Sequence, residues 1–188
     1  MQHVTEYLKN ISALVERLPQ DQIARVAEAL RDIYRADGII YVCGNGGSAA
    51  TASHFALDLA KGTRPTAAKR RVRAVALTDS VPLLTAWAND TRYADVFAEQ
   101  LAAWYRPGDG LVAISGSGNS PNVLQAVQFV NAQGGVTCGL TGYAGGQLVK
   151  LAQHAVVVPS DDLEKIEDCH MLLCHLYTAY LRQELALG

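Results

Sequence analysis

Five short apolar runs rich in β-branched residues constrain the fold of this chain more than any other feature. Their apolar residues are nearly continuous rather than alternating, which is typical of strands buried on both faces of a sheet. The runs cover residues 39–43, 72–77, 111–114, 136–140 and 155–158.

Stretches with helical character separate these runs. Strands that alternate with helices predict an α/β fold, in which a parallel sheet carries helices on both sides. The predicted helices cover residues 48–61, 81–88, 94–105 and 122–133, and a long C-terminal helix covers 163–185.

The first 37 residues predict two further helices. Apolar residues recur at helical spacing from Val4 to Leu18, and the pattern resumes from Ile23 to Ile33 after a break at Pro19. Gly38 ends the second helix. The chain has 188 residues and shows no internal repeat or linker, so we expect a single domain over residues 1–188.

Charge and cysteine usage narrow the function classes. A formal net charge of -2 gives no electrostatic reason to expect nucleic acid. The basic cluster at 69–73 is expected to be a solvated loop rim, with an arginine that reaches an anionic ligand as the alternative.

We find no signal-peptide pattern and no apolar stretch that could span a bilayer. Four cysteines inside apolar runs indicate reduced core thiols, so we expect a cytoplasmic protein without a membrane partner. They are Cys43, Cys138, Cys169 and Cys174.

Two Gly/Ser-rich loops follow the first and third predicted strands, and each opens a helix. They are residues 44–48 (Gly-Asn-Gly-Gly-Ser) and 115–120 (Ser-Gly-Ser-Gly-Asn-Ser). Ligands of open parallel sheets bind at the carboxyl ends of the strands. Glycines allow close approach of the backbone, and a helix N-terminus offers free N–H groups to an anion. Together with the hydroxyls of Ser48, Ser115, Ser117 and Ser120, the loops predict a phosphate site without a lysine.

A dinucleotide site is the competing interpretation of the first loop. Gly44, Gly46 and Ala49 fit the relaxed G-x-G-x-x-G/A pattern after a strand. Asp79 would be the acidic ribose partner, but it lies about 30 residues past the loop rather than the usual ~20. A dinucleotide fold also does not require the second loop.

These loops and several other segments resemble the bacterial phosphoheptose isomerases. The matching segments are 44–50 with His54, 83–86 with Asn89 and Asp90, 114–120, 140–142 with Gly145 and Gly146, and 165–170 with His175. The match covers nearly the whole chain in the right order.

The resemblance implies the SIS (sugar isomerase) domain, a flavodoxin-like three-layer sandwich with a five-stranded parallel sheet. It implies a homotetramer with active sites at subunit interfaces, in which the helical pair of residues 1–37 serves oligomer packing. The implied reaction converts sedoheptulose 7-phosphate to D-glycero-D-manno-heptose 7-phosphate through an enediol.

The resemblance also implies roles for individual residues. Phosphate contacts are expected from the four loop serines, and sugar contacts from Asn45, Gly46, Gly47, Asn89 and Asp90, with Gly116 and Glu167 completing the substrate-binding set. One zinc ion is expected on His54, Asp58, Glu167 and His175. The expected catalytic residues are Asp58, Glu167 and His175.

This chain departs from the family pattern at three of these positions. Asp58 stands where the family has a glutamate, its presumed general base, and Glu167 stands where it has a glutamine. Gly116 replaces a common threonine. Aspartate is one methylene shorter than glutamate, which matters because a base must lie within hydrogen-bond reach of its proton. Glu167 is therefore a second candidate for the base.

Spacing on the helices gives an independent view of the metal site. His54 and Asp58 are four residues apart and share one helix face. Glu167 and His175 are eight apart, which spans about 12 Å along a helix. On spacing alone Glu167 and His170 form a competing pair, whereas the resemblance favours His175.

Three other functions remain open from the sequence. A non-catalytic relative that binds the bacterial replication initiator would lose the last-helix histidine, and His175 is present. An isomerase of another phosphosugar would follow if Asp58 and Glu167 reshape the site. A sugar-phosphate sensor is less favoured, because such modules come with a DNA-binding domain for which the chain has no room.

Overall fold

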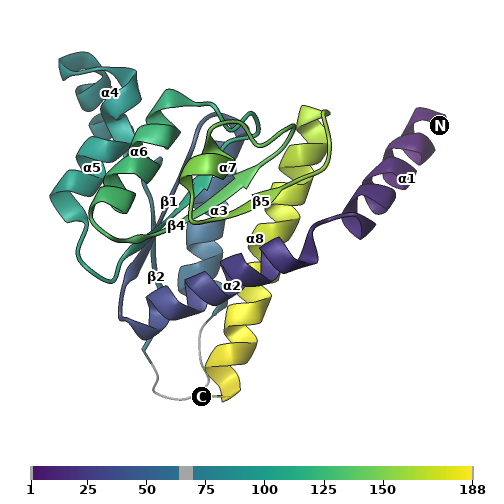
Figure 1. Ribbon diagram of the computed structural model, residues 1–188, viewed down its shortest axis with the longest axis horizontal. Coiled ribbons are helices and arrows are strands. Elements are labelled where there is room, and N and C mark those ends of the chain that lie inside the picture. Colours follow the sequence, from purple (N-terminus) through teal and green to yellow (C-terminus); the bar gives the residue numbers. More distant parts are fainter. Residues whose placement is uncertain (1, 64–69, 188) are drawn as a thin grey trace.

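A single parallel sheet of five strands forms the centre of the molecule, in the order β2-β1-β3-β4-β5 (Figure 1). The computed structural model describes residues 2–63 and 70–187. The strands are β1 (Ile39–Gly44), β2 (Arg73–Ala76), β3 (Gly110–Ile114), β4 (Val136–Thr141) and β5 (His154–Val157). Each lies within two residues of its predicted run. Because β1 has β2 on one side and β3 on the other, the direction of the strand order reverses at β1, and the gap between β1 and β3 is the place where such sheets bind ligands.

Helices cover both faces of the sheet, as the alternating pattern predicts. Alternate residues of β1 show why: Ile40 and Val42 pack on one side, whereas Tyr41 and Cys43 pack on the other. The first side is covered by α2 (Gln20–Arg35), α3 (Gly47–Leu57) and α8 (Leu163–Leu187). The second side is covered by α5 (Val96–Trp104), α6 (Pro121–Ala132) and the short α7 (Leu148–Leu151). α4 (Val81–Asp90) continues this layer beyond the sheet (Figure 1).

The helix after the first loop differs from the prediction in its last turn. The α-helical part ends at Leu57, and residues Asp58–Gly62 form a π-helix. A π-helical turn is rare and is found often at functional sites. Its first residue, Asp58, is a predicted site residue. Two other details were not predicted: a 3-10 turn at Tyr93–Asp95 precedes α5, and the four-residue α7 is too short to give a periodic pattern.

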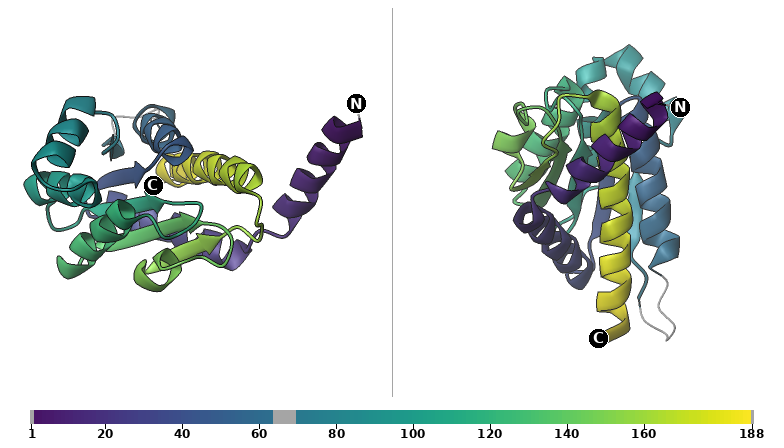
Figure 2. Two further views of the ribbon diagram at one scale, coloured as in Figure 1. Left: turned by 90° about the horizontal axis from the view of Figure 1, so that it is seen from above. Right: turned by 90° about the vertical axis from the view of Figure 1, so that its right-hand side faces the viewer.

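The first helix, α1 (Gln2–Glu16), projects from the body of the chain (Figures 1 and 2). Leu14 is its one buried residue, whereas Val4 and Leu8 are 58% and 60% exposed. An amphipathic helix that buries so little within its own chain has an apolar face left over. No helix in residues 2–63 and 70–187 is long and apolar enough to cross a membrane.

The basic cluster lies at the amino end of β2, the opposite end from the two loops. Arg70 and Arg73 both pair with Asp37, and Arg70 also stacks on the ring of Tyr34. These contacts support a structured rim for the two arginines. Lys69 lies outside the described residues.

Candidate active site

The first loop joins β1 to α3 through a tight backbone turn. Gly46 caps the helix with a φ of +54°, a conformation that side-chain-bearing residues rarely adopt. At Gly44 a Cβ would lie only 2.7 Å from the carbonyl oxygen of Ser48, so only glycine fits. Ser48 is 6% exposed, and its hydroxyl has no hydrogen-bond partner among the described residues. The first turn of α3 therefore offers backbone N–H groups and a free hydroxyl at the carboxyl edge of the sheet.

The second loop is anchored by backbone hydrogen bonds to the end of β4, to the loop that follows β4, and to the start of α7. Ser115 N donates to Leu140 O at 3.0 Å, and Gly116 O accepts from Gly142 N at 2.9 Å. Gly118 has a φ of +66° and its carbonyl accepts from Leu148 N at 2.9 Å. The loop is thus held in a fixed shape by its surroundings.

Two of the three serine hydroxyls of the second loop lie side by side. Ser115 Oγ and Ser120 Oγ lie 3.1 Å apart, and Ser117 Oγ accepts from the backbone N–H of Asn119 at 3.2 Å. Ser115 is buried and Ser120 caps α6. Hydroxyls next to a helix N-terminus suit an anionic group such as phosphate.

Three predicted metal ligands come together where the end of α3 packs against α8. His54 Nε2 and His175 Nε2 each lie 3.5 Å from the same carboxylate oxygen, Oδ2 of Asp58. The three groups lie within 4.8 Å of one another, and the two imidazole rings are 5.2 Å apart in an edge-to-face arrangement. His54 comes from α3, Asp58 from the π-helical turn and His175 from α8. We call this set the His-Asp-His cluster.

The cluster fits a zinc ion by its donor chemistry and spacing. Two imidazole nitrogens and one carboxylate oxygen are ligands that zinc accepts. Ligands placed 2.0–2.1 Å from a tetrahedral ion lie roughly 3.4 Å apart, close to the two 3.5 Å separations. Three protein ligands are the usual number at catalytic zinc sites, where the fourth position is open.

Glu167, the fourth predicted ligand, lies elsewhere. Its carboxylate oxygens are 2.6 and 2.7 Å from the point where a Cβ on Gly47 would be, so it packs against the first loop. Glu167 is half-buried and has no hydrogen-bond or ion-pair partner among the described residues. The structure therefore separates the two candidate bases: Asp58 belongs to the His-Asp-His cluster, and Glu167 is an unpaired carboxylate beside the loop.

His170, the alternative partner of Glu167, is not part of the cluster. It is 1% exposed, and neither ring nitrogen makes a hydrogen bond to the described residues. Burial lowers the pKa of His170 to about 4, while the nearby backbone of Thr141 opposes this shift. His170 is thus a buried, neutral histidine beside the end of β4, and among the described residues Glu167 pairs with neither His170 nor His175.

Asn89 and Asp90 lie at the exposed end of α4. Asn89 Nδ2 donates to Asp90 Oδ1 at 2.9 Å. No hydrogen bond among the described residues joins either of them to the two loops, so their predicted contact with a sugar is untested within one chain.

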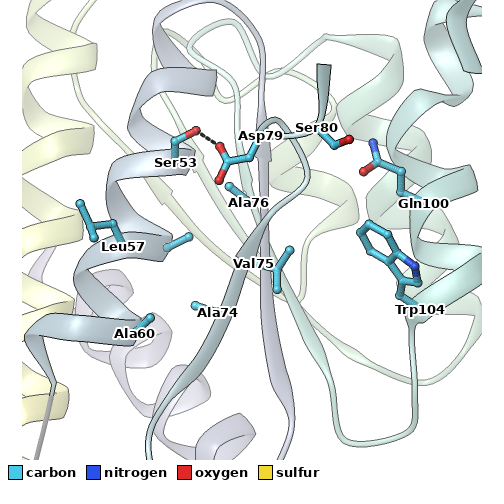
Figure 3. Close-up of a pocket in the computed structure, with 11 residues that line it drawn as sticks. Ser53, Leu57, Ala60, Ala74, Val75, Ala76, Asp79, Ser80, Gln100 and Trp104 are labelled. Carbon is cyan, nitrogen blue, oxygen red and sulfur yellow. Dashed lines mark hydrogen bonds between the residues drawn. The ribbon is translucent and has the colours of Figure 1, made fainter. Parts of the chain in front are cut away.

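A hollow of about 400 Å³ runs along the edge strand β2, and it is lined by none of the predicted site residues (Figure 3). Its base is the small apolar stretch of β2, and Trp104 forms one wall. Asp79, the acidic residue of the dinucleotide interpretation, lies in this hollow and accepts a hydrogen bond from Ser53 of α3. It is thus held by α3 in the hollow beside β2.

Comparison with known proteins identifies the family. The SIS domain family matches residues 6–142. A phosphoheptose isomerase of Campylobacter jejuni is 41% identical over 154 residues, which cover 82% of each protein. A phosphoheptose isomerase of Chlorobaculum parvum is 38% identical and aligns with 90% of this chain and 82% of its own length. This chain belongs to the phosphoheptose isomerase family.

The fold of the family agrees with the structure. The solved structure of a phosphoheptose isomerase from Neisseria gonorrhoeae superposes with a TM-score of 0.89 at 32% identity, covering 97% of this chain and 98% of that one. The predicted five-stranded parallel sheet with flanking helices is therefore confirmed, including the long C-terminal helix.

One departure from the family pattern has a neighbour that accounts for it. A Cβ on Gly116 would lie 2.7 Å from Cδ1 of Leu163, the first residue of α8. The space that a threonine would take at this position is thus filled by a leucine side chain.

Two polar residues beside the loops were missed by the sequence analysis. Asn122 is 1% exposed and exchanges two hydrogen bonds with Asn45, and Tyr93 donates a third to Asn45. Asn122 follows Pro121 in what reads as an ordinary helix start, and Tyr93 lies in a short turn far away in sequence. One hint of this contact is present in the sequence: Asn122 comes just after the second loop, which follows β3, and β3 is the neighbour of β1 in the sheet.

Proposed function

We propose that this protein is an aldose–ketose isomerase that converts sedoheptulose 7-phosphate to D-glycero-D-manno-heptose 7-phosphate. The observation that supports it most is that one chain carries both features: two serine-rich helix N-termini at the carboxyl edge of the sheet, and a cluster of two histidines and a carboxylate between α3 and α8. The curated relatives at 38–41% identity carry the name phosphoheptose isomerase.

The loops hold the phosphate at the end of the sugar away from the reacting carbons. Backbone N–H groups of α3 and α6 and the hydroxyls of Ser48, Ser115, Ser117 and Ser120 bind it. Binding energy at the phosphate positions C1 and C2 for proton transfer. The rest of the substrate is contacted by residues of both loops, namely Asn45, Gly46, Gly47 and Gly116. Asn89 and Asp90 contribute further contacts with the sugar.

His54, Asp58 and His175 would hold one zinc ion. When bound, it supplies a Lewis acid that polarises the sugar carbonyl. We assign Asp58 as the third zinc ligand because both histidines face the same carboxylate oxygen of Asp58. Glu167 remains near enough to the first loop to contact the substrate instead.

Glu167 is the carboxylate that moves the proton. It takes a C1 proton of the ketose while the C2 carbonyl oxygen gains a proton from solvent water, which gives the enediol. The O1 hydroxyl then returns a proton to water, and Glu167 gives its proton to C2, which gives the aldose. No redox partner is needed, because one hydrogen moves from C1 to C2 of the same molecule.

The first experiment is incubation of the zinc-loaded protein with sedoheptulose 7-phosphate, with the aldose product followed by NMR. Turnover is expected. Tight binding of the sugar phosphate without turnover would contradict the isomerase function. Other ketose phosphates run in parallel test the substrate.

The assignment of the two carboxylates is tested by Asp58→Asn and Glu167→Gln. We expect both variants to lose turnover, and only Asp58→Asn to lose zinc as measured by metal analysis. Glu167→Gln with full turnover, alongside an inactive but zinc-loaded Asp58→Asn, would assign the base to Asp58.

We further propose that the chain forms a homotetramer with active sites at subunit interfaces. Exposed apolar residues of α1 and the half-exposed Leu172 and Leu176 of α8 support packing through the helical pair of residues 1–37. The side chains of His54 and His175 are 46% and 54% exposed, which leaves room for a neighbouring subunit over the site. Light scattering coupled to size exclusion should give four chains, and Leu8→Glu should lower that number.

We place the protein in the cytoplasm. All four cysteines are unpaired and buried, which suits a reducing compartment. Fractionation of the native host followed by immunoblotting tests this location.

A further inference from the structure

A side-chain bridge joins the first loop to the start of α6 across the gap between β1 and β3, and no role assigned above uses it. Asn45 Nδ2 donates to Asn122 Oδ1 at 2.8 Å, and Asn122 Nδ2 donates to Asn45 Oδ1 at 2.8 Å. The hydroxyl of Tyr93 donates to the same Asn45 Oδ1 at 3.1 Å. The bridge thus ties the first loop to α6 at the point where the strand order reverses.

A backbone N–H fixes which way both amides face. Val123 N lies in the first turn of α6, where N–H groups have no partner within the helix, and it donates to Asn122 Oδ1 at 3.0 Å. A backbone N–H can only donate, so the atom of Asn122 that faces it is the oxygen. Asn45 must then turn its nitrogen toward that oxygen and its own oxygen toward Asn122 Nδ2.

This orientation determines what Asn45 has left for a ligand. Its oxygen already accepts two hydrogen bonds, from Asn122 and Tyr93, and an amide oxygen has two lone pairs. Its nitrogen has donated one of two hydrogens. Asn45 therefore offers one N–H donor and no acceptor.

We propose that Asn122 and Tyr93 are positioning residues that hold Asn45 as a hydrogen-bond donor to an oxygen of the sugar part of the substrate. This inference rests on the proposed function, since it concerns the same phosphosugar site. A fixed donor suits a carbonyl oxygen that gains negative charge on the way to an enediol, because such an oxygen only accepts.

The test is Asn122→Asp, which keeps the size of a residue that is 1% exposed. One carboxylate oxygen still accepts from Val123 and Asn45, but the other faces Asn45 Oδ1. Turning the Asn45 amide around only moves the oxygen–oxygen contact to the other side. We expect kcat/KM for sedoheptulose 7-phosphate to fall about tenfold or more, as for loss of one hydrogen bond to a charged group, with the larger part in kcat. Affinity for inorganic phosphate, measured by calorimetry, should change less than about twofold.

Asn131→Asp is the matched control. Asn131 is on the same helix and also donates and accepts side-chain hydrogen bonds, with Leu151 O and Thr137 Oγ1, but at the end away from the loops. We expect its kcat/KM to stay near that of the wild type. Equal losses in the two variants, or an equal loss of sugar turnover and phosphate affinity in Asn122→Asp, would overturn the proposal.

Tyr93→Phe keeps the buried asparagine pair intact and so avoids a folding defect. It removes one of two donors to Asn45 Oδ1, and we expect a smaller loss of kcat/KM, about threefold. No loss in Tyr93→Phe together with none in Asn122→Asp overturns the inference and leaves the isomerase function standing. If the wild type shows no turnover, the proposed function fails, and the bridge is judged by whether Asn122→Asp weakens binding of sedoheptulose 7-phosphate more than binding of inorganic phosphate.

Discussion

The two loops and the His-Asp-His cluster are built in different ways. The loops are backbone structures: Ser48 and Ser115 are 6% and 4% exposed, and neighbouring loops hold Gly116 and Gly118 by backbone hydrogen bonds. The cluster consists of three side chains from three helical segments, with side-chain exposures of 46%, 26% and 54%. We therefore expect phosphate binding to be a property of the fold, and the chemistry to depend on a few exposed side chains that can change without changing the fold.

Removing His175 separates the two regions most sharply. His175→Ala deletes one of three cluster ligands. We expect loss of bound zinc and a fall in turnover of about 10²–10³-fold, the usual range for removing a group that stabilises a developing oxyanion. Metal analysis and the NMR assay measure both. Affinity for inorganic phosphate should be unchanged, and a parallel loss of phosphate binding would show that loops and cluster are not independent.

Acidification tests the buried histidine at the end of β4, His170. The pKa of His170 is about 4 in the folded chain and 6.5 in the unfolded chain, so between these values the unfolded state binds the extra proton. Stability from this group is complete above pH 6.5 and declines as the pH falls toward 4, by about 3 kcal/mol in total. Denaturant unfolding at several pH values should show this slope. His170→Leu should flatten it, and an equal slope in that variant would show that other groups cause it.

The fold could be predicted from the sequence because its signal is repeated. The three central strands β1, β3 and β4 are apolar runs because they are buried on both faces, and the partly exposed edge strands β2 and β5 are still short apolar runs between helices. Most helices have enough residues to show their period. The His54–Asp58 contact could be predicted because residues four apart on a helix lie on the same face as neighbours.

The rest of the site could not be predicted because it depends on where helices end and cross. Eight residues separate Glu167 from His175, and only the packing of α8 on α3 shows that one meets Gly47 and the other meets Asp58. The Asn45–Asn122 bridge joins residues 77 apart, so no local spacing contains it. The family resemblance supplied the list of residues, and the structure divided them between two places.

Removing one loop hydroxyl should affect the loops and leave the His-Asp-His cluster unchanged. Ser115→Ala deletes a buried group beside Ser120 Oγ. We expect affinity for inorganic phosphate to fall about tenfold, as for one hydrogen bond to a charged group, with zinc content unchanged. Calorimetry measures the affinity. Ser53→Ala is the matched control, since Ser53 lies on α3 but faces Asp79, and a similar loss there would point to general loosening of the fold.

Gly47→Ala tests a contact between the first loop and a candidate catalytic side chain, Glu167. The new methyl group would lie 2.6 Å from a carboxylate oxygen of Glu167, which must move because it is the end of a flexible side chain. We expect a several-fold loss of kcat, about 1 kcal/mol in the barrier, with little change in unfolding free energy or zinc content. The same substitution in a Glu167→Gln background gives a double-mutant cycle. If the methyl group acts by displacing the Glu167 carboxylate, it should cost much less turnover once that carboxylate is gone, whereas an equal loss in both backgrounds would mean that Gly47 matters for the loop alone.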